Sequence, residues 1–321
     1  MGDFLHKGSE TPLSEFFVAA GAACRLSTNF EPILEAARES FFPVYGSQSY
    51  SAFHLRFWVD VKAGSKPPWP KPYFRGLGHL IFAGFDAQNS MMIDLRARRA
   101  IGRFSPAMGA DNVSWKTIIF PVLLSIMGAS VGIVELHCAC VVRDENGLLL
   151  AGGSGSGKST LALALAQSGF AFLSDDRTYV SEHEGRMFAW GLPTLLKLRP
   201  DAMAWFPEMK DLTPPLARNA ERAIQIDPSA QLGLPRARRC EPRGLIFLER
   251  LEYPAFDLGV MPRAEATALL EEDLIAEASD AVEKQVGMIG ALVELPCWRL
   301  AHGGAPGPVA QELARRWRTG H

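Results

Sequence analysis

Residues 145–160 read Glu-Asn-Gly-Leu-Leu-Leu-Ala-Gly-Gly-Ser-Gly-Ser-Gly-Lys-Ser-Thr, and this stretch decides the fold. The apolar run at 148–151 is typical of a short strand that is buried on both faces. A glycine loop occupies 152–157, and residues 160–166 are good helix formers. This order of strand, glycine loop and helix predicts an α/β domain built around a P-loop.

The loop matches the pattern G-x-x-x-x-G-K-S/T. Such a loop turns its backbone N–H groups towards a triphosphate, and the start of the next helix adds partial positive charge. We expect Lys158 to reach the β- and γ-phosphates and Ser159 to place its hydroxyl on Mg²⁺. The alternative is a flexible Gly/Ser linker, which the flanking strand and helix start disfavour. The predicted ligands are ATP and Mg²⁺, and the predicted nucleotide-binding residues are Gly152, Gly153, Ser154, Gly155, Ser156, Gly157, Lys158, Ser159 and Thr160.

Two carboxylates follow the next apolar run. Residues 170–173 read as a second buried strand, and Asp175 and Asp176 come directly after it. In an open parallel sheet the ligand crevice lies at the carboxyl ends of the strands. One carboxylate can help to hold Mg²⁺, and the other can accept a proton from an attacking hydroxyl. Taken without the P-loop, the minor alternative for the pair is an acidic turn.

The spacing around the P-loop is similar to that of a known family. Fourteen residues separate His137 from Gly152, and Leu-Ser-Asp-Asp-Arg follows at 173–177. This pattern resembles the kinase domain of HPr kinase/phosphorylase, and most closely the HPr-kinase-related proteins of bacterial gene clusters. Phosphoenolpyruvate carboxykinase shares the nucleotide core. The strong part of the match covers about residues 132–200, a weaker part extends to about residue 302, and the family's usual N-terminal domain is not matched.

The resemblance implies roles for particular residues. Lys158 and Ser159 are the phosphate and metal ligands of the P-loop, and Asp176 is the metal carboxylate. Asp175 is the base towards a substrate serine hydroxyl, and His137 lies near the metal and the aspartates. The sequence alone favours a hydrogen-bonded core histidine at 137. The catalytic residues implied are therefore Asp175, His137 and Lys158, with Ser159 and Asp176 at the metal.

One part of the family pattern is displaced. The family carries Glu-x-Arg-Gly-Leu soon after the aspartates, where this chain has Gly-Leu-Pro-Thr-Leu-Leu-Lys-Leu-Arg-Pro at 191–200. A similar run, Glu-Pro-Arg-Gly-Leu, occurs only at 241–245 and leads into a strand-like segment. Glu241 is therefore not assigned as a metal ligand, and the phosphorylase half of the family's activity is left open.

Composition excludes several classes of protein. The net charge of −2 over 321 residues argues against nucleic acid as a main partner. The cysteines show no paired metal spacing and are odd in number, which predicts buried thiols in a reducing cytosol. A Cys-Cys-His metal site formed by His137, Cys138 and Cys140 is the minor alternative. The first residues show no secretory signal, so we expect a cytoplasmic protein.

Residues 118–134 carry no charge, which raises the question of a membrane span. The run is shorter than the ~20 residues that a spanning helix needs, and it contains Pro121, Gly128 and Gly132. We instead predict a buried helix, capped by Ser114 and ending near Gly128, followed by a strand at 133–142. No membrane partner is therefore expected.

Residues 1–112 are predicted to form a separate α+β domain. A short helix is expected at 12–20, and a second at 31–41 with Asn29 as its cap. Alternating residues predict strands at 53–61, 79–85 and 91–97. The aromatic side chains of this region (Trp58, Trp69, Phe74, Phe82 and Phe85) are expected mainly in the core. Position alone suggests that this domain holds the substrate or a partner.

Residues 113–321 are predicted to form a P-loop kinase domain of the HPr kinase/carboxykinase type with a mixed central sheet. A hairpin is expected at 178–190, helices at 264–278, 281–292 and 309–318, and a last strand at 297–302. Residues 200–244 are rich in Pro and Arg, which fits either a mobile substrate loop or a solvated surface segment. The arginines concerned are Arg218, Arg222, Arg236, Arg238, Arg239 and Arg243.

The predicted function is ATP-dependent transfer of the γ-phosphoryl group to a hydroxyl, with Asp175 as base and charge neutralised by Lys158 and Mg²⁺. The acceptor is expected to be a serine of a protein or peptide. Two alternatives stay open: a regulatory module that binds ATP without transfer, and a simple NTPase with water as acceptor. The family that the chain resembles also implies a homo-oligomer.

Overall fold

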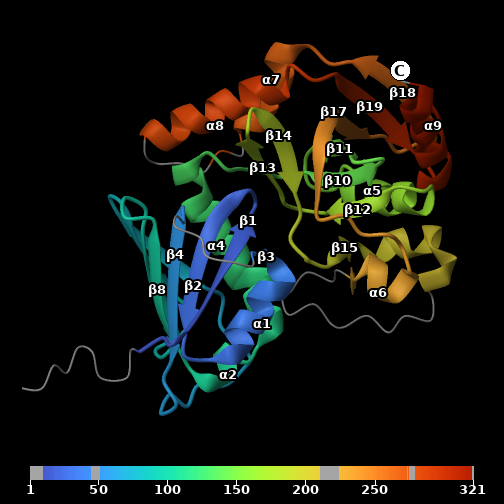
Figure 1. The fold of residues 1–321 in the computed structure, drawn as a ribbon. Helices are drawn as coiled ribbons and strands as arrows, with labels where there is room; N and C mark the ends of the chain where they lie inside the picture. The colour runs from blue at the N-terminus through green and yellow to red at the C-terminus, as the bar shows by residue number, and fades with distance from the viewer. Residues whose placement is uncertain (1–9, 45–50, 210–223, 273, 275–278, 320–321) are drawn as a thin grey trace, which may run out of the picture. The chain divides into compact units, whose positions relative to one another are not determined.

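The computed structural model describes residues 10–44, 51–209, 224–272, 274 and 279–319, and the chain divides into two compact units (Figure 1). The first comprises Met1–Ile133 and Ile275–Gln285, and the second comprises Val134–Leu274 and Val286–His321. The apolar helix before Ile133 thus belongs to the first unit, whereas the sequence analysis began the second domain at residue 113.

The first unit contains an eight-stranded mixed sheet in the order β3-β1-β2-β4-β8-β7-β6-β5. The pairs β2–β4 and β4–β8 are parallel, and the remaining pairs are antiparallel. The strands are β1 Leu13–Ala19, β2 Ala22–Thr28, β3 Phe42–Val44, β4 Phe53–Val59, β5 Tyr73–Leu77, β6 Leu80–Gly84, β7 Ser90–Asp94 and β8 Arg99–Phe104. The strands predicted at 53–61, 79–85 and 91–97 are confirmed as β4, β6 and β7.

The helix predicted at 12–20 is wrong, because this segment is strand β1. β1 pairs with β2 through a two-residue turn in which Ala20 and Gly21 both have positive φ, 48° and 89°. Two consecutive positive φ values give the turn twist that a tight hairpin prefers. The pairing across this hairpin outweighs the local helix preference of the small residues.

The second predicted helix is confirmed as α1, Glu31–Ser40, but its predicted cap is wrong. Phe30 occupies the cap position, and its side chain makes no capping bond. The Asn29 amide instead bonds the backbone of Val59, donating to its O (3.0 Å) and accepting from its N (2.7 Å). Asn29 therefore links the helix start to strand β4.

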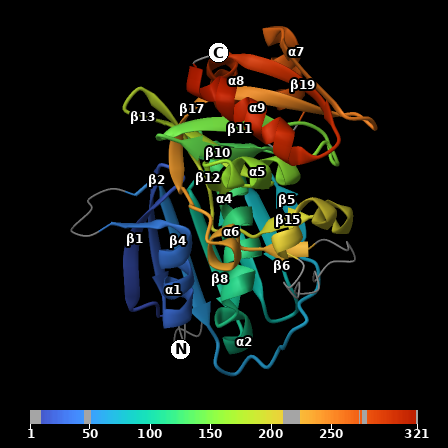
Figure 2. The same cartoon turned by 90° about the vertical axis from the view of Figure 1, so that its right-hand side faces the viewer.

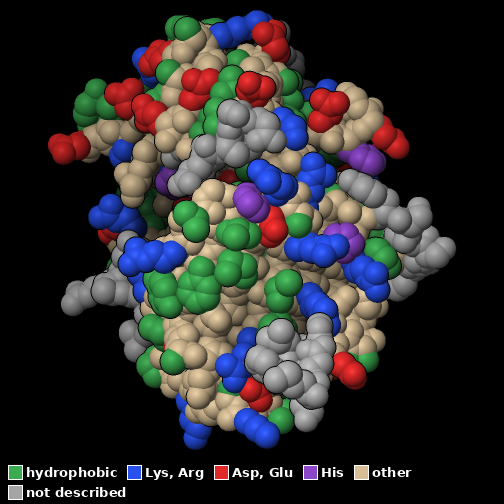
Figure 3. Space-filling model, turned by 90° about the vertical axis from the view of Figure 1, so that its left-hand side faces the viewer, with side chains coloured by type: hydrophobic (Ala, Val, Ile, Leu, Met, Phe, Trp, Pro, Cys, Tyr) green, Lys and Arg blue, Asp and Glu red, His purple; other side chains and the backbone are tan. Residues whose placement is uncertain are grey.

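One face of this sheet is buried and the other is open. Strand pairing places alternate residues on the open face, and arginine and aromatic side chains are frequent among them. Figure 3 shows basic and hydrophobic side chains interspersed on this side of the molecule. They include Phe16, Arg25, His54, Arg56, Trp58, Phe82, Met92, Arg99, Ile101 and Arg103. Of the five aromatic residues expected mainly in the core, only Phe85 is buried. A half-covered sheet accepts aromatic residues on both faces, which explains the wrong assignment.

The helical segment Asn112–Val131 is long and apolar enough to cross a membrane by length and composition, with mean hydropathy 1.5. It consists of α3 (Asn112–Ser114), a π-helical turn (Trp115–Ile119), α4 (Phe120–Gly128) and a final 3₁₀ turn. Its aromatic residues pack in the first unit's core, where the rings of Phe41 and Phe120 are 4.9 Å apart. The predicted buried helix is confirmed, but Asp111 caps it in place of Ser114.

The second unit contains a nine-stranded sheet that is mixed, as predicted. Its main path is β12-β10-β11-β17-β14-β13-β9, and β19 pairs with both β17 and β18. The strands are β9 Val134–Leu136, β10 Ala139–Arg143, β11 Asn146–Ala151, β12 Ala171–Ser174, β13 Thr178–His183, β14 Arg186–Trp190, β17 Arg239–Arg250, β18 Ala255–Val260 and β19 Cys297–Gly303. The predicted hairpin at 178–190 and the last strand at 297–302 are both confirmed.

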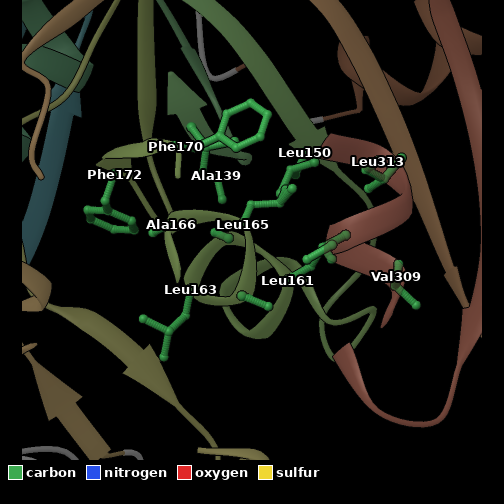
Figure 4. Packing of buried hydrophobic residues seen from close by; sticks show 14 of the residues in the cluster. Ala139, Leu150, Leu161, Leu163, Leu165, Ala166, Phe170, Phe172, Val309 and Leu313 are labelled. Atoms are coloured by element: carbon green, nitrogen blue, oxygen red, sulfur yellow. The ribbon is translucent and has the colours of Figure 1, made fainter. Parts of the chain in front are cut away.

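Helices cover this sheet on both faces. On one face α5 (Lys158–Gln167) and α9 (Pro306–Thr319) lie side by side (Figure 2). In Figure 4 the side chains of Leu161 and Leu165 lie in one apolar layer with Leu150 of the sheet and Leu313 of α9. The other face packs against α7 (Arg263–Glu271) and the second half of α8 (Ser279–Leu292). The four helices fall where the sequence predicted them, although α7 ends earlier than residue 278 and residues 273 and 275–278 lie outside the described part.

The strand predicted at 133–142 is divided in two. β9 pairs with β13, whereas β10 pairs with β11 and β12. His137 and Cys138 form the break between them. The apolar pattern is continuous across this break, so only the different pairing partners reveal it.

The Pro- and Arg-rich segment 200–244 is only partly described. It contains two 3₁₀ turns (Pro200–Trp205 and Pro207–Met209), β16 (Ile224–Ile226), which pairs with β15 (Leu196–Leu198), and α6 (Pro228–Leu232). Residues 210–223, which include Arg218 and Arg222, lie outside the described residues.

Candidate active site

Five strands of the second unit place their polar residues at one edge of its sheet. β11, β12, β17 and β19 run in the same direction, and the antiparallel β10 begins where they end. The glycine loop follows β11, Asp175 and Asp176 follow β12, and His302 lies near the end of β19. His137 stands just before β10. The tertiary structure thus gathers the residues singled out from the sequence at the carboxyl edge, where α/β sheets bind ligands.

The glycine loop has a backbone that only glycine adopts easily at three positions, one of which is Gly155 with a φ of 83°. Gly152 has a φ of 141° and Gly157 a φ of 98°. A Cβ at Gly152 would also lie only 2.8 Å from the carbonyl oxygen of Leu248. The Ser156 carbonyl oxygen accepts a hydrogen bond from Nε2 of the buried His302 (3.0 Å), so Nε2 carries the proton. These constraints hold the loop against the ends of β17 and β19.

Lys158 begins α5 and is almost fully buried, with 8% of its surface exposed. Its Nζ donates to the carbonyl oxygens of Gly152 (2.6 Å) and Gly153 (3.2 Å). The amine therefore lies under the loop and can exchange these carbonyls for phosphate oxygens. Ser159 and Thr160 are half-buried beside it, whereas Gly153, Ser154 and Gly155 are exposed along the rim of the loop.

Asp175 is 2% exposed, and one of its two carboxylate oxygens lacks a partner. Oδ2 accepts a hydrogen bond from the backbone N of Lys197 (2.8 Å), whereas Oδ1 has none among the described residues. Burial raises the pKa of Asp175 to about 6, although the Lys197 N–H and the nearby Ser159 hydroxyl counteract part of the rise. A carboxyl group with such a pKa exchanges protons near neutral pH, as a general base must.

Asp176 lies beside Asp175 but in a more polar environment. Its Oδ1 is 3.0 Å from Nε2 of His137, and its Oδ2 is 3.8 Å from Nζ of Lys197. The hydrogen bond from His137 lowers the pKa of Asp176 to about 2, and the charge of Lys197 adds to this effect. Asp176 thus stays ionised at neutral pH. His137 is exposed and faces this carboxylate, whereas the residues alone favoured a core histidine.

The side chains of Ser159, Asp175 and Asp176 offer oxygen ligands, which Mg²⁺ prefers. Among the described residues no group of three His, Cys, Asp or Glu side chains is arranged to hold a metal ion. A magnesium ion bound here would therefore take its remaining ligands from phosphate oxygens and water, which is how the ion usually binds. The unpartnered Oδ1 of Asp175 fits such an ion or a proton-donating substrate equally well.

Three basic residues near the loop were missed by the sequence reasoning. Lys197 contacts both aspartates, through its backbone N and its Nζ. A Cβ at Gly155 would lie 3.6 Å from Nη1 of Arg199, and one at Gly157 would lie 3.8 Å from Nη1 of Arg250. Lys197 and Arg199 follow the aspartates by about 20 positions in a segment with no clear periodicity, and Arg250 ends a buried strand. Only the position of Arg250 at a strand end could have indicated its place.

The displaced Glu-Pro-Arg-Gly-Leu run lies far from this edge. Glu241 pairs in register with Asn146, the first residue of β11, whereas the glycine loop follows the last. Six residues of extended strand separate the two, or about 20 Å. Glu241 forms ion pairs with Arg186 and Arg243. The structure therefore supports leaving Glu241 out of the metal site.

The Cys-Cys-His alternative does not hold. Cys138 and Cys140 point into the apolar core that packs against α7 and α8, whereas His137 faces Asp176. Sγ of Cys140 lies 3.8 Å from Sγ of Cys240. All five cysteines are described, all are buried and none forms a disulfide, as the sequence predicted.

Three described arginines of the 200–244 segment make contacts with other strands and loops of the second unit. Arg236 donates to the carbonyl oxygens of Leu192 (3.1 Å) and Thr194 (3.0 Å), and Arg243 donates to Oδ1 of Asn146 (2.9 Å). Arg239 lies over the rings of Phe188 and Trp190. These three described arginines therefore make structural contacts, whereas Arg199 and Arg250 lie close to the glycine loop.

No protein-family model matches the chain, and no curated protein sequence matches it either. Among solved structures, the chain is similar to the Hpr(Ser) kinase/phosphatase from Coxiella burnetii, with 13% sequence identity and a TM-score of 0.34. The alignment covers 58% of this chain and 90% of that one. A structural similarity with this TM-score gives no evidence about function. The geometry of the site is the evidence for function.

Proposed function

We propose that the protein is an ATP-dependent kinase that transfers the γ-phosphoryl group to a hydroxyl, namely a serine of a protein or peptide. The observation that carries the proposal is the buried Asp175 with its unpartnered Oδ1, next to Ser159 of a P-loop and to the ionised Asp176. A buried carboxyl with a pKa near neutral is suited to act as a general base in proton transfer.

The proposed roles follow from this geometry. The loop N–H groups and Lys158 bind the phosphates of ATP, and Arg199 and Arg250 add positive charge beside them. Asp175 takes the serine proton as the serine oxygen bonds to the γ-phosphorus. The bond between that phosphorus and the bridging oxygen breaks, and ADP leaves. Ser159 and Asp176 hold Mg²⁺, which neutralises charge on the phosphates, and His137 orients Asp176 through its hydrogen bond.

The experiment is an incubation of the purified protein with γ-labelled ATP, Mg²⁺ and the small proteins and peptides encoded beside it. Asp175→Asn and Lys158→Ala are run in parallel. We expect label on a serine of a partner that is lost in both variants, while Asp175→Asn still binds ATP. Label that persists in Asp175→Asn would contradict the role of Asp175 as base.

A regulatory module that binds ATP without transfer is the second candidate, because no three-residue metal group occurs among the described residues. Tight ATP binding with no labelled partner and negligible phosphate release would favour it. Phosphate release without a labelled partner would indicate a simple NTPase. We propose a cytoplasmic location, where buried thiols stay reduced. We also propose a homo-oligomer, which light scattering can test.

A further inference from the structure

A cavity of about 460 Å³ opens beside the start of the P-loop. Gly152, Gly153 and His137 form its wall towards the site, and Leu269 of α7 lies among the apolar residues of the opposite wall. Glu249, at the end of β17, and Glu272, just after α7, complete the rim. This volume falls in the range of small-ligand sites and can receive one or two side chains of a peptide.

The cavity borders the start of the glycine loop and His137, and it does not include the start of α5. In an in-line transfer the attacking and leaving oxygens lie on opposite sides of the phosphorus. Lys158 binds the phosphates and Ser159 binds Mg²⁺ in the proposed mechanism, and neither residue lines the cavity. His137 lines it instead and contacts Asp176 beside the proposed base. Neither aspartate lines the cavity, but His137 connects it to Asp176.

The rim of the cavity carries an excess of negative charge. Arg299 lines the cavity, but it forms an ion pair with Glu265. Glu249 and Glu272 are exposed, and among the described residues neither side chain has an ion-pair partner. Two carboxylates next to an apolar wall complement a positively charged side chain with an apolar neighbour, and they repel an acidic one.

We propose that this cavity is the acceptor site and that Glu249 and Glu272 select a serine flanked by a basic and an apolar residue. The inference rests on the proposed kinase function and specifies its substrate class. The apolar wall around Leu269 receives the apolar neighbour, and the two glutamates bind the basic side chain. The serine hydroxyl then reaches Asp175 past His137.

A positional peptide library, supplied with γ-labelled ATP and Mg²⁺, tests the selection. The wild-type protein should phosphorylate peptides with Arg or Lys near the serine at least about tenfold faster than their Asp or Glu counterparts. Glu249→Gln combined with Glu272→Gln should remove most of this preference. Glu271→Gln is the matched control, because Glu271 is also exposed on α7 but does not line the cavity. Phosphorylation without basic preference, or ATP binding with no phosphorylated peptide, would overturn the inference.

A second variant decides whether the cavity holds the acceptor or the nucleoside. Leu269→Trp fills the cavity, and it should abolish peptide phosphorylation while the Kd for ATP changes less than about twofold. A nucleoside site would show weakened binding of ATP but unchanged binding of tripolyphosphate, and this result would overturn the inference. A wild-type protein that binds neither compound would overturn the proposed kinase itself, so the two failures are distinguishable.

Discussion

The two sheets of this protein differ in how many of their faces are covered. The sheet of the first unit packs against helices on one face, and its open face carries residues such as Arg56, Trp58 and Ile101. The sheet of the second unit is covered on both faces, and its central strand β11 is apolar from Leu148 to Ala151. In a sheet that is covered on both faces, polar groups can reach a ligand only at the ends of the strands. The candidate site therefore lies at an edge of the second sheet, where five strands converge.

The largest expected effect is a loss of phosphoryl transfer, caused by a substitution in the candidate site of the second unit. Lys158→Ala removes the buried amine that faces the phosphates, and phosphoryl transfer should fall by at least about a thousandfold. The control is Lys62→Ala, which removes an exposed lysine of the first unit and should leave transfer unchanged. Transfer of label from ATP measures both. Equal activity in the two variants would contradict the assignment of phosphoryl transfer to the second unit.

The next largest expected effect is a loss of stability, caused by a substitution in the sheet that is covered on both faces. Leu149→Ala removes a fully buried side chain of β11, and the free energy of unfolding should fall by about 2–5 kcal/mol. Ile101→Ala on the open face removes a side chain that is 45% exposed, and it should change stability by less than about 1 kcal/mol. Urea unfolding of both variants measures the difference. Similar losses would mean that the open face is covered in solution.

Asp175→Asn should stabilise the metal-free protein while it abolishes transfer. The pKa of this carboxyl rises from an ordinary value of 3.8 to about 6 in the folded state. Stability is therefore lost as the pH rises through this interval, because the unfolded chain releases a proton that the folded protein keeps. At pH 8 the variant should gain up to about 3 kcal/mol. Asparagine carries no charge and can still accept the bond from Lys197.

Thermal unfolding with EDTA at several pH values tests this prediction. The advantage of Asp175→Asn should be full above pH 7 and should shrink as the pH falls from about 6 to about 4. Asp257→Asn, at an exposed aspartate of the same unit, is the matched control. A constant difference between Asp175→Asn and wild type at all pH values would point to a packing effect in place of ionisation.

The smallest expected effects are the stability changes caused by replacing one glycine of the loop and one glycine of a covering helix. Gly157→Ala places a Cβ at a φ of 98° and 3.1 Å from Cε1 of His302, so stability should fall by about 1–2 kcal/mol and ATP should bind more weakly. Gly287→Ala, in an exposed position of α8 with open space around it, should raise stability by about 0.5–1 kcal/mol. Melting temperatures of both variants, measured with and without ATP, test these predictions. If Gly157→Ala stabilised the protein, the loop would not require glycine at this position.

The elements that the sequence identified correctly are those with a strong local signal. The run 148–160 combines an apolar strand, glycines and a helix start, and all three occur at the expected positions as β11, the loop and α5. The aspartate pair at the end of β12 follows from the same kind of signal. These features depend on neighbours in the sequence, so no distant contact is needed to define them.

The errors occur where a distant partner decides the structure. Strand β1 forms because it pairs with β2, although its residues suggested a helix. His137 leaves the core because β9 and β10 pair with different strands on either side of it. Lys197, Arg199 and Arg250 reach the loop from separate segments, and no local pattern marks them as neighbours.

The sequence by itself determined the glycine loop, its lysine and serine, the buried strands and the paired carboxylates, because each is defined by a short run of residues with one backbone preference. Only the tertiary structure decided that Asp175 is buried with a raised pKa and that Asp176 is ionised beside His137. It also placed the acidic cavity next to them. Burial and charge depend on what surrounds a residue in space, and those surroundings come from strands and helices that are distant in the chain.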